Sequence, residues 1–197
     1  MLDNLKSYQV VLASKSPRRQ ELLRGMGLDF TVLTKETPET FPSDMSPEKV
    51  PAFLSRQKSL AFAAEELPAS FLLITADTIV LAGNEILGKP VDRDDALRML
   101  GMLSGKRHHV VTGVTVRNAL RSKTFSAKSA VRFAELDADE MCYYVDRYRP
   151  YDKAGSYGIQ EWIGYIGVRG IEGSFYNVMG LPVQRLYQEL GTMGELL

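Results

Sequence analysis

The sequence predicts an α/β protein built on a mixed central β-sheet with flanking helices. In segment 8–34, an apolar strand (8–13), a helix (17–26) and a second apolar strand (29–34) follow one another, as in parallel β/α units. Two long strands are expected further on, over 108–117 and 123–134. In the second of these, apolar or small residues alternate with polar ones from Phe125 to Phe133, which is typical of an antiparallel strand with one buried face. Both kinds of strand in one chain predict a mixed sheet.

Local signals predict the other elements. Residues 71–82 are apolar and β-branched, which favours a central strand, and Gly83-Asn84 turns the chain into a short strand at 85–87. Asp92 is a cap that predicts a helix over 93–103. We further expect a helix that begins at Ser46 or Pro51 and ends near 66, a helix over 137–148, a loop over 149–160, a strand near 164–169 and a last helix over 182–190.

Composition limits the classes of protein. A chain of 197 residues that is 45% hydrophobic predicts one domain over residues 1–197 with a real core. Lys plus Arg and Asp plus Glu each number 24, so the formal net charge is zero, which argues against a nucleic-acid polymer or a membrane surface as partner. No apolar run approaches the ~20 residues that cross a bilayer. The single cysteine, Cys142, cannot form an internal disulfide and predicts a cytoplasmic location.

Residues 14–19 predict an anion site. Ser14-Lys15-Ser16-Pro17-Arg18-Arg19 joins a strand to a helix, with Ser16 at the cap and Pro17 at the first helical position. A helix N-terminus offers free N–H groups and a positive dipole end. Two hydroxyls and three cations there suit a polyphosphate. The alternative interpretation is a capped helix with solvated basic residues.

Asp77 is the strongest candidate for chemistry. It lies within the apolar run 71–82, where an ionised carboxylate must be exposed at a bend or paired. Such a residue is a metal ligand, a general base or a structural acceptor, and the sequence alone leaves these three open.

Weaker signals add cations and a hydrogen-bonding amide. Lys89 lies between Gly88 and Pro90, a stiff turn that could hold an ammonium against a phosphate. Gln160 ends a loop and offers a donor and an acceptor, which suits the edge of a nucleobase. Lys58 is uninformative by itself. Phosphate-binding cations with acidic residues and no evident nucleophile favour metal-assisted attack of water on a phosphate ester.

Taken together, the motifs resemble those of the Maf family of nucleoside triphosphate pyrophosphatases. The resemblance covers most of the chain, and its specificity comes from the order of the motifs rather than from any one of them. The matching segments are Ser14–Arg19, Pro38–Pro42, Arg56–Lys58, Ala76–Thr78, Gly88–Pro90, Leu103–Gly105 followed by His109, Asp152–Gln160 and Asn177–Pro182.

The resemblance implies a cytoplasmic enzyme that cleaves a nucleoside triphosphate between the α and β phosphates with a divalent cation, Mg²⁺ or Mn²⁺. It implies an elongated two-lobed architecture with a central cleft, similar to inosine triphosphate pyrophosphatases, and a homodimer as a family-level expectation. Asp77 would be the general base and, with Glu39, a metal ligand; Glu36 is the alternative to Glu39. The residues expected to bind the substrate are Ser14, Ser16, Arg18, Arg19, Lys58, Thr78, Lys89 and Gln160.

Three positions bear on the substrate. Arg18, Thr78 and Gln160 resemble the branch of the family that acts on dTTP and UTP. Gln160 can pair with the O4/N3–H edge of uracil or thymine, and cytosine would leave polar groups unpaired. The segment 161–165 departs from the family by being bulkier than expected, which leaves the shape of the pocket or a dimer contact open.

Two other functions compete with this interpretation. A nucleotidyltransferase also uses a basic loop and a lysine to hold a triphosphate, but needs a second substrate pocket. A nucleotide-binding regulator linked to cell division would need no catalysis. Asp77 argues against the second, because a carboxylate beside phosphates repels them unless a metal is present.

Overall fold

The computed structural model describes residues 2–193, and these residues form two compact units. Of the described residues, unit 1 comprises 2–77, 112–127 and 180–193, and unit 2 comprises Thr78–Val111 and Lys128–Met179. Residues 1 and 194–197, which the single-domain prediction includes, lie outside the described residues.

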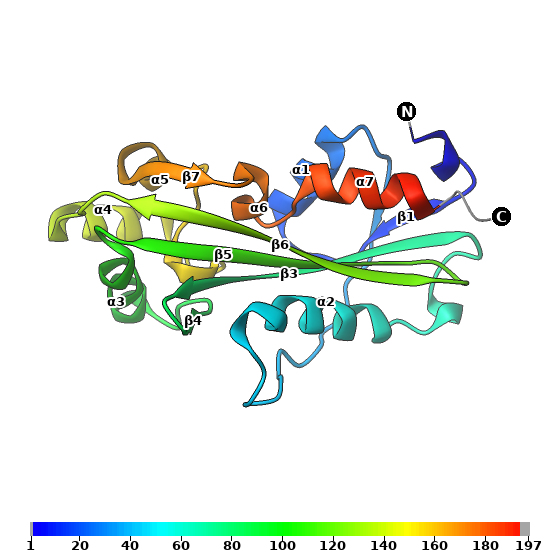
Figure 1. Cartoon of the computed structure of the whole chain (residues 1–197), viewed down its shortest axis with the longest axis horizontal. Helices are drawn as coiled ribbons and strands as arrows, with labels where there is room; N and C mark the ends of the chain where they lie inside the picture. Colours follow the sequence, from blue (N-terminus) through cyan, green and yellow to red (C-terminus); the bar gives the residue numbers. More distant parts are fainter. Residues whose placement is uncertain (1, 194–197) are drawn as a thin grey trace. The chain divides into compact units, whose positions relative to one another are not determined.

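The described residues contain a mixed β-sheet, which confirms the predicted fold class (Figure 1). Its strand order is β2-β1-β3-β5-β6-β7, with β4 paired to β3. β1 runs parallel to β2 and β3, whereas β4 is antiparallel to β3 and β7 is antiparallel to β6. The strands span Gln9–Leu12 (β1), Thr31–Val32 (β2), Phe71–Ala82 (β3), Glu85–Leu87 (β4), Arg107–Arg117 (β5), Ser122–Phe133 (β6) and Val168–Glu172 (β7).

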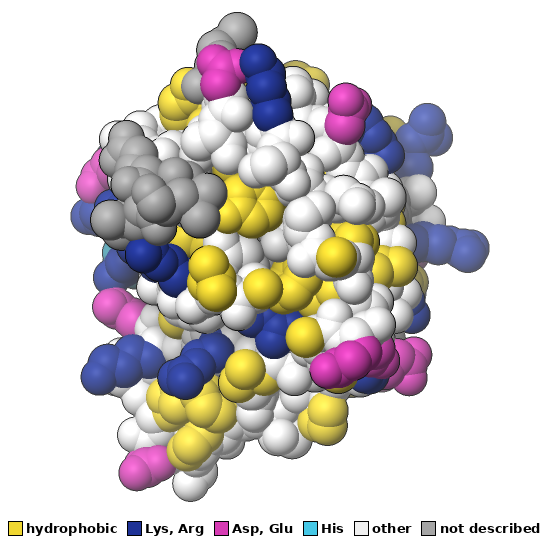
Figure 2. All heavy atoms as spheres, turned by 90° about the vertical axis from the view of Figure 1, so that its right-hand side faces the viewer, with side chains coloured by type: hydrophobic (Ala, Val, Ile, Leu, Met, Phe, Trp, Pro, Cys, Tyr) yellow, Lys and Arg dark blue, Asp and Glu magenta, His cyan; other side chains and the backbone are white. Residues whose placement is uncertain are grey.

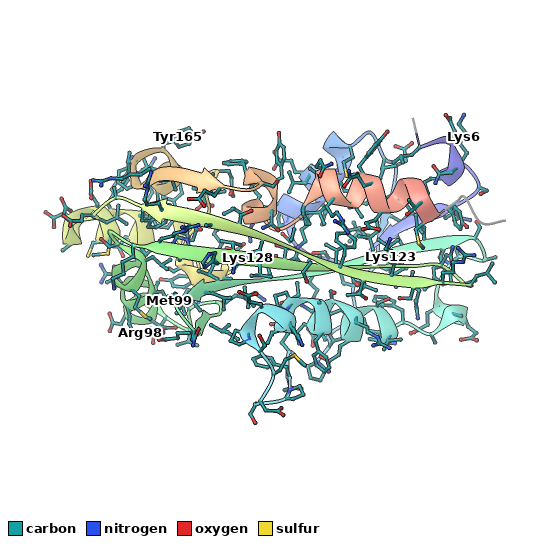
Figure 3. The ribbon with its side chains drawn as sticks, viewed as in Figure 1. Lys6, Arg98, Met99, Lys123, Lys128 and Tyr165 are labelled. Atoms are coloured by element: carbon teal, nitrogen blue, oxygen red, sulfur yellow. The ribbon has the colours of Figure 1, made fainter. Side chains whose placement is uncertain are left out.

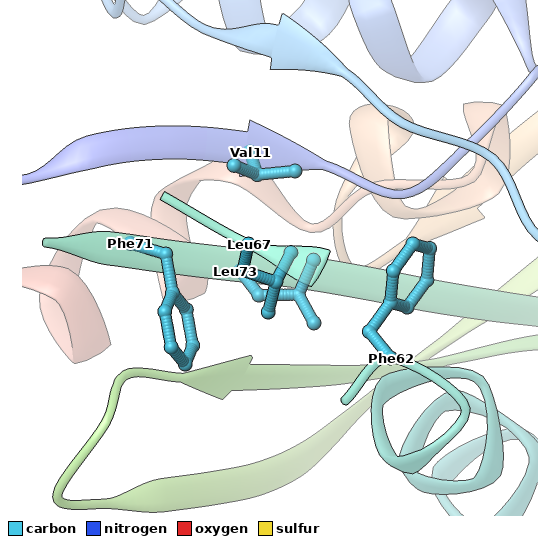
Figure 4. Close-up of a cluster of buried hydrophobic side chains, with 5 residues drawn as sticks. All are labelled: Val11, Phe62, Leu67, Phe71 and Leu73. Atoms are coloured by element: carbon cyan, nitrogen blue, oxygen red, sulfur yellow. The ribbon is translucent and has the colours of Figure 1, made fainter. Parts of the chain in front are cut away.

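Unit 1 packs helices on the parallel strands. Its core contains Val11 of β1 with Phe71 and Leu73 of β3, closed by Phe62 and Leu67 (Figure 4). A buried hydroxyl also ties helix to strand, because Thr75 Oγ1 donates to the Ser55 carbonyl at 2.7 Å. The helices are α1 (Pro17–Gly25), α2 (Val50–Leu60) and α7 (Val183–Met193), with 3₁₀ turns at Asp3–Leu5, Pro47–Lys49 and Ala64–Glu66.

Unit 2 has its own core. On α3 (Arg93–Leu103), Met99 is buried whereas the neighbouring Arg98 is exposed and pairs with Asp95 at 2.8 Å (Figure 3). The rings of His108, Phe133 and Tyr157 meet edge to face, with centroids 4.9–5.4 Å apart. The other helices of the unit are α4 (Ala138–Tyr148), α5 (Trp162–Gly167) and α6 (Phe175–Met179), with a 3₁₀ turn at Ala154–Ser156.

The structure corrects several predicted elements. The helix expected to reach about 66 ends at Leu60, because the Arg117 guanidinium donates to the Phe62 carbonyl at 2.7 Å and Phe62 turns into the core. The strand expected near 164–169 is wrong over residues 164–167, since Trp162–Gly167 is helical and β7 begins at Val168. Helix α6 was not expected, and the strand expected over 29–34 is only Thr31–Val32.

The molecular surface mixes charges. On the face drawn in Figure 2, basic, acidic and apolar side chains are interspersed, as a formal net charge of zero suggests. Among the described helices, none is both long and apolar enough to cross a membrane.

Candidate active site

The loop between β1 and α1 has the geometry that its sequence predicts. Pro17 opens α1, and Ser16 caps it by accepting the Arg19 N–H at 3.5 Å. Ser14, itself buried, accepts the Ser16 N–H at 3.2 Å. The two hydroxyls therefore fix the backbone at the positive end of the helix, where an anion is favoured. Arg18 lies half-buried in the first turn.

Arg19 points from α1 toward the middle of β3. Its Nη1 donates to the Ala76 carbonyl and its Nε to the Gly180 carbonyl, both at 2.8 Å. Burial lowers the pKa of the guanidinium, and the charge of Asp77 opposes that shift. Because an arginine remains protonated in proteins, the result is a fixed positive charge beside the residue that precedes Asp77.

Asp77, Lys58 and Glu39 form one cluster. Lys58 Nζ lies 2.5 Å from Asp77 Oδ1 and 2.8 Å from Glu39 Oε1, so a single ammonium bridges two carboxylates. The exposed fraction of the side chain rises from 10% for Asp77 to 19% for Lys58 and 49% for Glu39. Asp77 is thus the buried end of a charge cluster that opens to solvent at Glu39.

The two acidic candidates of the segment 36–39 are placed differently. Glu36 is 95% exposed at its side chain and lies 3.7 Å from Lys15, on the polar loop. Glu39 contacts the ammonium that also contacts Asp77. Of the two, only Glu39 joins the Asp77 cluster.

The donor atoms of this cluster suit a hard divalent cation. Two carboxylates from different segments converge on one positive charge, and carboxylate oxygen is the ligand that Mg²⁺ prefers. Over residues 2–193, no group of three His, Cys, Asp or Glu side chains is arranged to hold a metal. Two protein carboxylates, completed by substrate phosphates and water, are typical of magnesium in phosphoryl-transfer sites.

Three further residues expected to bind the substrate belong to unit 2. Thr78 is half-buried, and Lys89 is exposed between Gly88 and Pro90. The Gly88 carbonyl accepts the Gly155 N–H at 3.0 Å, which ties the Lys89 turn to the loop that ends in Gln160. The amide oxygen of Gln160 is buried and has no hydrogen-bond partner among the described residues.

The contacts that hold this loop are a finding of the structure. Lys153 is buried and paired with Asp152 and Glu161, and Tyr144 of α4 donates to Glu161. The sequence marks 152–160 as a loop with adjacent opposite charges, of the kind that carries sites. It gives no signal for Tyr144 or for the partner of Lys153. Only the burial of a lysine, which demands a counter-charge, would have signalled the pair.

The mixed sheet, the capped basic loop and the Asp77–Glu39 pair define an α/β protein in which a helix N-terminus and two carboxylates that converge on one lysine form the candidate site. The family model described as Maf-like protein matches residues 9–193, and the chain belongs to this family.

Relatives match nearly end to end. A dTTP/UTP pyrophosphatase of Porphyromonas gingivalis is 54% identical over 197 residues, which cover 99% of each chain. One of Bacteroides fragilis is 54% identical over 191 residues, 96% of this chain and 98% of that protein. One of Flavobacterium psychrophilum is 44% identical over 182 residues, 92% of this chain and 93% of that protein.

Proposed function

We propose that this chain is a nucleoside triphosphate pyrophosphatase that hydrolyses dTTP and UTP to the nucleoside monophosphate and pyrophosphate. The observation that carries the proposal is the convergence of Asp77 and Glu39 on the Lys58 ammonium, with the half-buried Arg19 bonded to the neighbouring Ala76 carbonyl. The relatives at 54% identity bear the name of this activity, which supplies the substrate class.

The reaction is a displacement at the α-phosphorus. A water oxygen forms a bond to that phosphorus, the bond from the phosphorus to the α–β bridging oxygen breaks, and pyrophosphate leaves with the electron pair. Asp77 takes the proton of the attacking water, since its carboxylate is an acceptor held in place by Lys58. Phosphoryl transfer needs positioning and charge neutralisation more than covalent help, and this chain offers residues for both.

The remaining roles are binding of the triphosphate, binding of the divalent ion and selection of the base. Arg18, Arg19, Lys58 and Lys89 bind the triphosphate, together with the N-terminus of α1 that Ser14 and Ser16 hold in shape. A divalent ion held by Asp77 and Glu39 would neutralise phosphate charge and lower the pKa of a bound water. Thr78 and Gln160 select the base, with Gln160 pairing to the edge that uracil and thymine share.

A panel of triphosphates tests the proposal. We expect dTTP and UTP to release pyrophosphate in the presence of Mg²⁺ at least about tenfold faster, in kcat/KM, than CTP, because one mismatched buried amide costs about 1–3 kcal/mol. ATP, GTP and 7-methyl-GTP should be hydrolysed more slowly still, because a pocket sized for the single ring of a pyrimidine excludes the double ring of a purine. Faster cleavage of CTP or 7-methyl-GTP would contradict the base assignment.

The position of cleavage has its own test. In water enriched in ¹⁸O, attack at the α-phosphorus places the label in the nucleoside monophosphate. Label in the pyrophosphate would show attack at the β-phosphorus, and release of orthophosphate would show cleavage elsewhere. Binding without any release would instead favour a regulator.

A further inference from the structure

In unit 2, one ion pair joins the two ends of the loop that carries Gln160. Lys153 Nζ, at the beginning of the loop, lies 3.1 Å from Glu161 Oε1 at its end. The Lys153 side chain is only 8% exposed, so this pair is largely removed from water. Breaking such a pair is costly, because it leaves a poorly solvated charge without its partner, so the pair favours the loop conformation that keeps Lys153 and Glu161 together.

A third side chain holds the loop in the middle. Tyr144 of α4 is fully buried; its hydroxyl donates to Glu161 Oε2 and accepts the Gly158 N–H at 2.9 Å. Gly158 passes so close to the carboxylate that a Cβ there would lie 2.8 Å from Glu161 Cδ. The backbone therefore rests on the Glu161 carboxylate, and a side chain at position 158 would displace the ends of Glu161 and Lys153.

Gln160 lies between these two fixed points, directly before Glu161. Its amide oxygen is buried without a partner among the described residues, whereas the Gly158 N–H and both oxygens of the Glu161 carboxylate have partners. The same loop holds Ser156 at φ +60°, a conformation that a side chain makes unfavourable. A fold that anchors its backbone so firmly around an unpaired acceptor prepares that acceptor for a donor from outside.

We propose that Lys153, Glu161 and Tyr144 form a positioning clamp that sets the selectivity of Gln160 for uracil and thymine over cytosine. The clamp rests on the proposed function. N3–H of uracil and thymine donates to a fixed amide oxygen, whereas N3 of cytosine is itself an acceptor. A loosened Gln160 could turn its amide and present N–H instead, so the loss of the clamp lowers selectivity.

The first test compares two adjacent tyrosines of α4. Tyr144→Phe removes the hydroxyl that bonds Glu161 and Gly158, and Tyr143→Phe is the matched control, because Tyr143 contacts Trp162 through its ring. We expect Tyr144→Phe to raise KM for UTP about tenfold with a smaller change in kcat, as the loss of positioned binding does. The ratio of kcat/KM for UTP to that for CTP should fall at least about fivefold, and Tyr143→Phe should leave it unchanged.

A double-mutant cycle separates positioning from a general structural effect. If the clamp acts through Gln160, Tyr144→Phe changes the UTP/CTP ratio in the wild type and leaves it unchanged in the Gln160→Ala background. An equal change in both backgrounds, or an unchanged ratio in folded Tyr144→Phe, overturns the proposal.

Two controls complete the design. Should Tyr144→Phe fail to fold, Glu161→Gln replaces it, because the amide keeps the size and still accepts the Tyr144 hydroxyl while it loses the charge that Lys153 pairs with. A wild-type UTP/CTP ratio in that variant overturns the clamp. A wild-type enzyme that does not prefer UTP to CTP overturns the base assignment itself, and with it the clamp.

Discussion

At the residue scale, Asp77 is a buried side chain whose carboxylate can both accept a proton and carry a negative charge. Asp77→Asn keeps the size of the side chain but cannot take a proton and neutralises a cation poorly. We expect kcat for dTTP to fall by at least about 10²- to 10⁴-fold, the usual effect of losing a general base. Circular dichroism and the thermal midpoint should stay near the wild type, since Lys58 keeps its contact with Glu39. A variant with wild-type kcat would remove Asp77 from the mechanism.

Glu39 and Glu36 allow a comparison of the same substitution at two nearby positions. Glu39→Gln weakens the second carboxylate of the cluster, whereas Glu36→Gln alters an exposed carboxylate that contacts Lys15. We expect Glu39→Gln to raise the Mg²⁺ concentration for half-maximal rate about tenfold or more, because hard cations depend on ligand charge. Glu36→Gln serves as the control with an unchanged requirement. The opposite result would make Glu36 the metal ligand.

At the scale of elements, α2 packs backbone to backbone on β5. A Cβ on Gly113 would lie 2.2 Å from Ala52 N and Pro51 C, and no side chain there can move aside to admit it. Gly113→Ala should therefore destabilise the protein by about 2–3 kcal/mol or more, as overpacking of a close contact does.

Gly101 is the matched control for this substitution. It lies within α3, and a Cβ there would meet nothing within 4 Å. Gly101→Ala should raise the free energy of unfolding by about 0.5–1 kcal/mol through helix propensity. Urea denaturation of both variants measures the difference, and a neutral Gly113→Ala would mean that α2 can shift on the sheet.

Elements with a local cause were predictable from the sequence. Asp92 caps α3 by accepting the Asp95 N–H, and α3 begins at Arg93, where this cap predicts it. The helix expected over 137–148 is α4, which Asp137 caps by accepting the Glu140 N–H. The helix 162–167 was not predictable, because its aromatic and β-branched residues favour a strand. It forms through tertiary packing: Ile163 is buried and the Cα of Gly164 lies against the Ile159 carbonyl. In short segments, tertiary packing of this kind overrides the intrinsic secondary-structure propensity of the residues.

In the candidate site, too, the residue types were predictable from the sequence, whereas the contacts between distant segments were not. Residue types and order were enough to select Asp77 and the basic loop 14–19, since each is chemically conspicuous. That one ammonium bridges Asp77 and Glu39 depends on how α2, β3 and the loop before α2 come together. The contact of Tyr144 with Glu161 joins a helix to a loop that only the fold brings within reach.

At the scale of the whole molecule, a buried histidine makes stability depend on pH. His108 is 1% exposed; its Nε2 bonds the Tyr157 hydroxyl at 2.8 Å, while no described residue bonds its Nδ1. Burial, with a smaller contribution from His109, lowers the pKa of His108 from its ordinary 6.5 to about 4. The imidazole is therefore neutral in the folded protein throughout the neutral range.

The sign of the pH effect follows from which state binds the proton. Below pH 6.5 the unfolded chain protonates His108, and the folded protein does so only near pH 4. The stability that neutral His108 provides is complete above pH 6.5 and is lost as the pH falls to about 4, by up to about 3 kcal/mol. Chemical denaturation at pH 7 and pH 4.5 measures this loss. In His108→Gln, which cannot titrate, the difference between the two pH values should shrink by about 2 kcal/mol, because the carboxylates contribute equally to both proteins. His109→Gln should retain most of the wild-type difference, and a His108→Gln curve parallel to the wild type would show that His108 is already accessible to protons in the folded state.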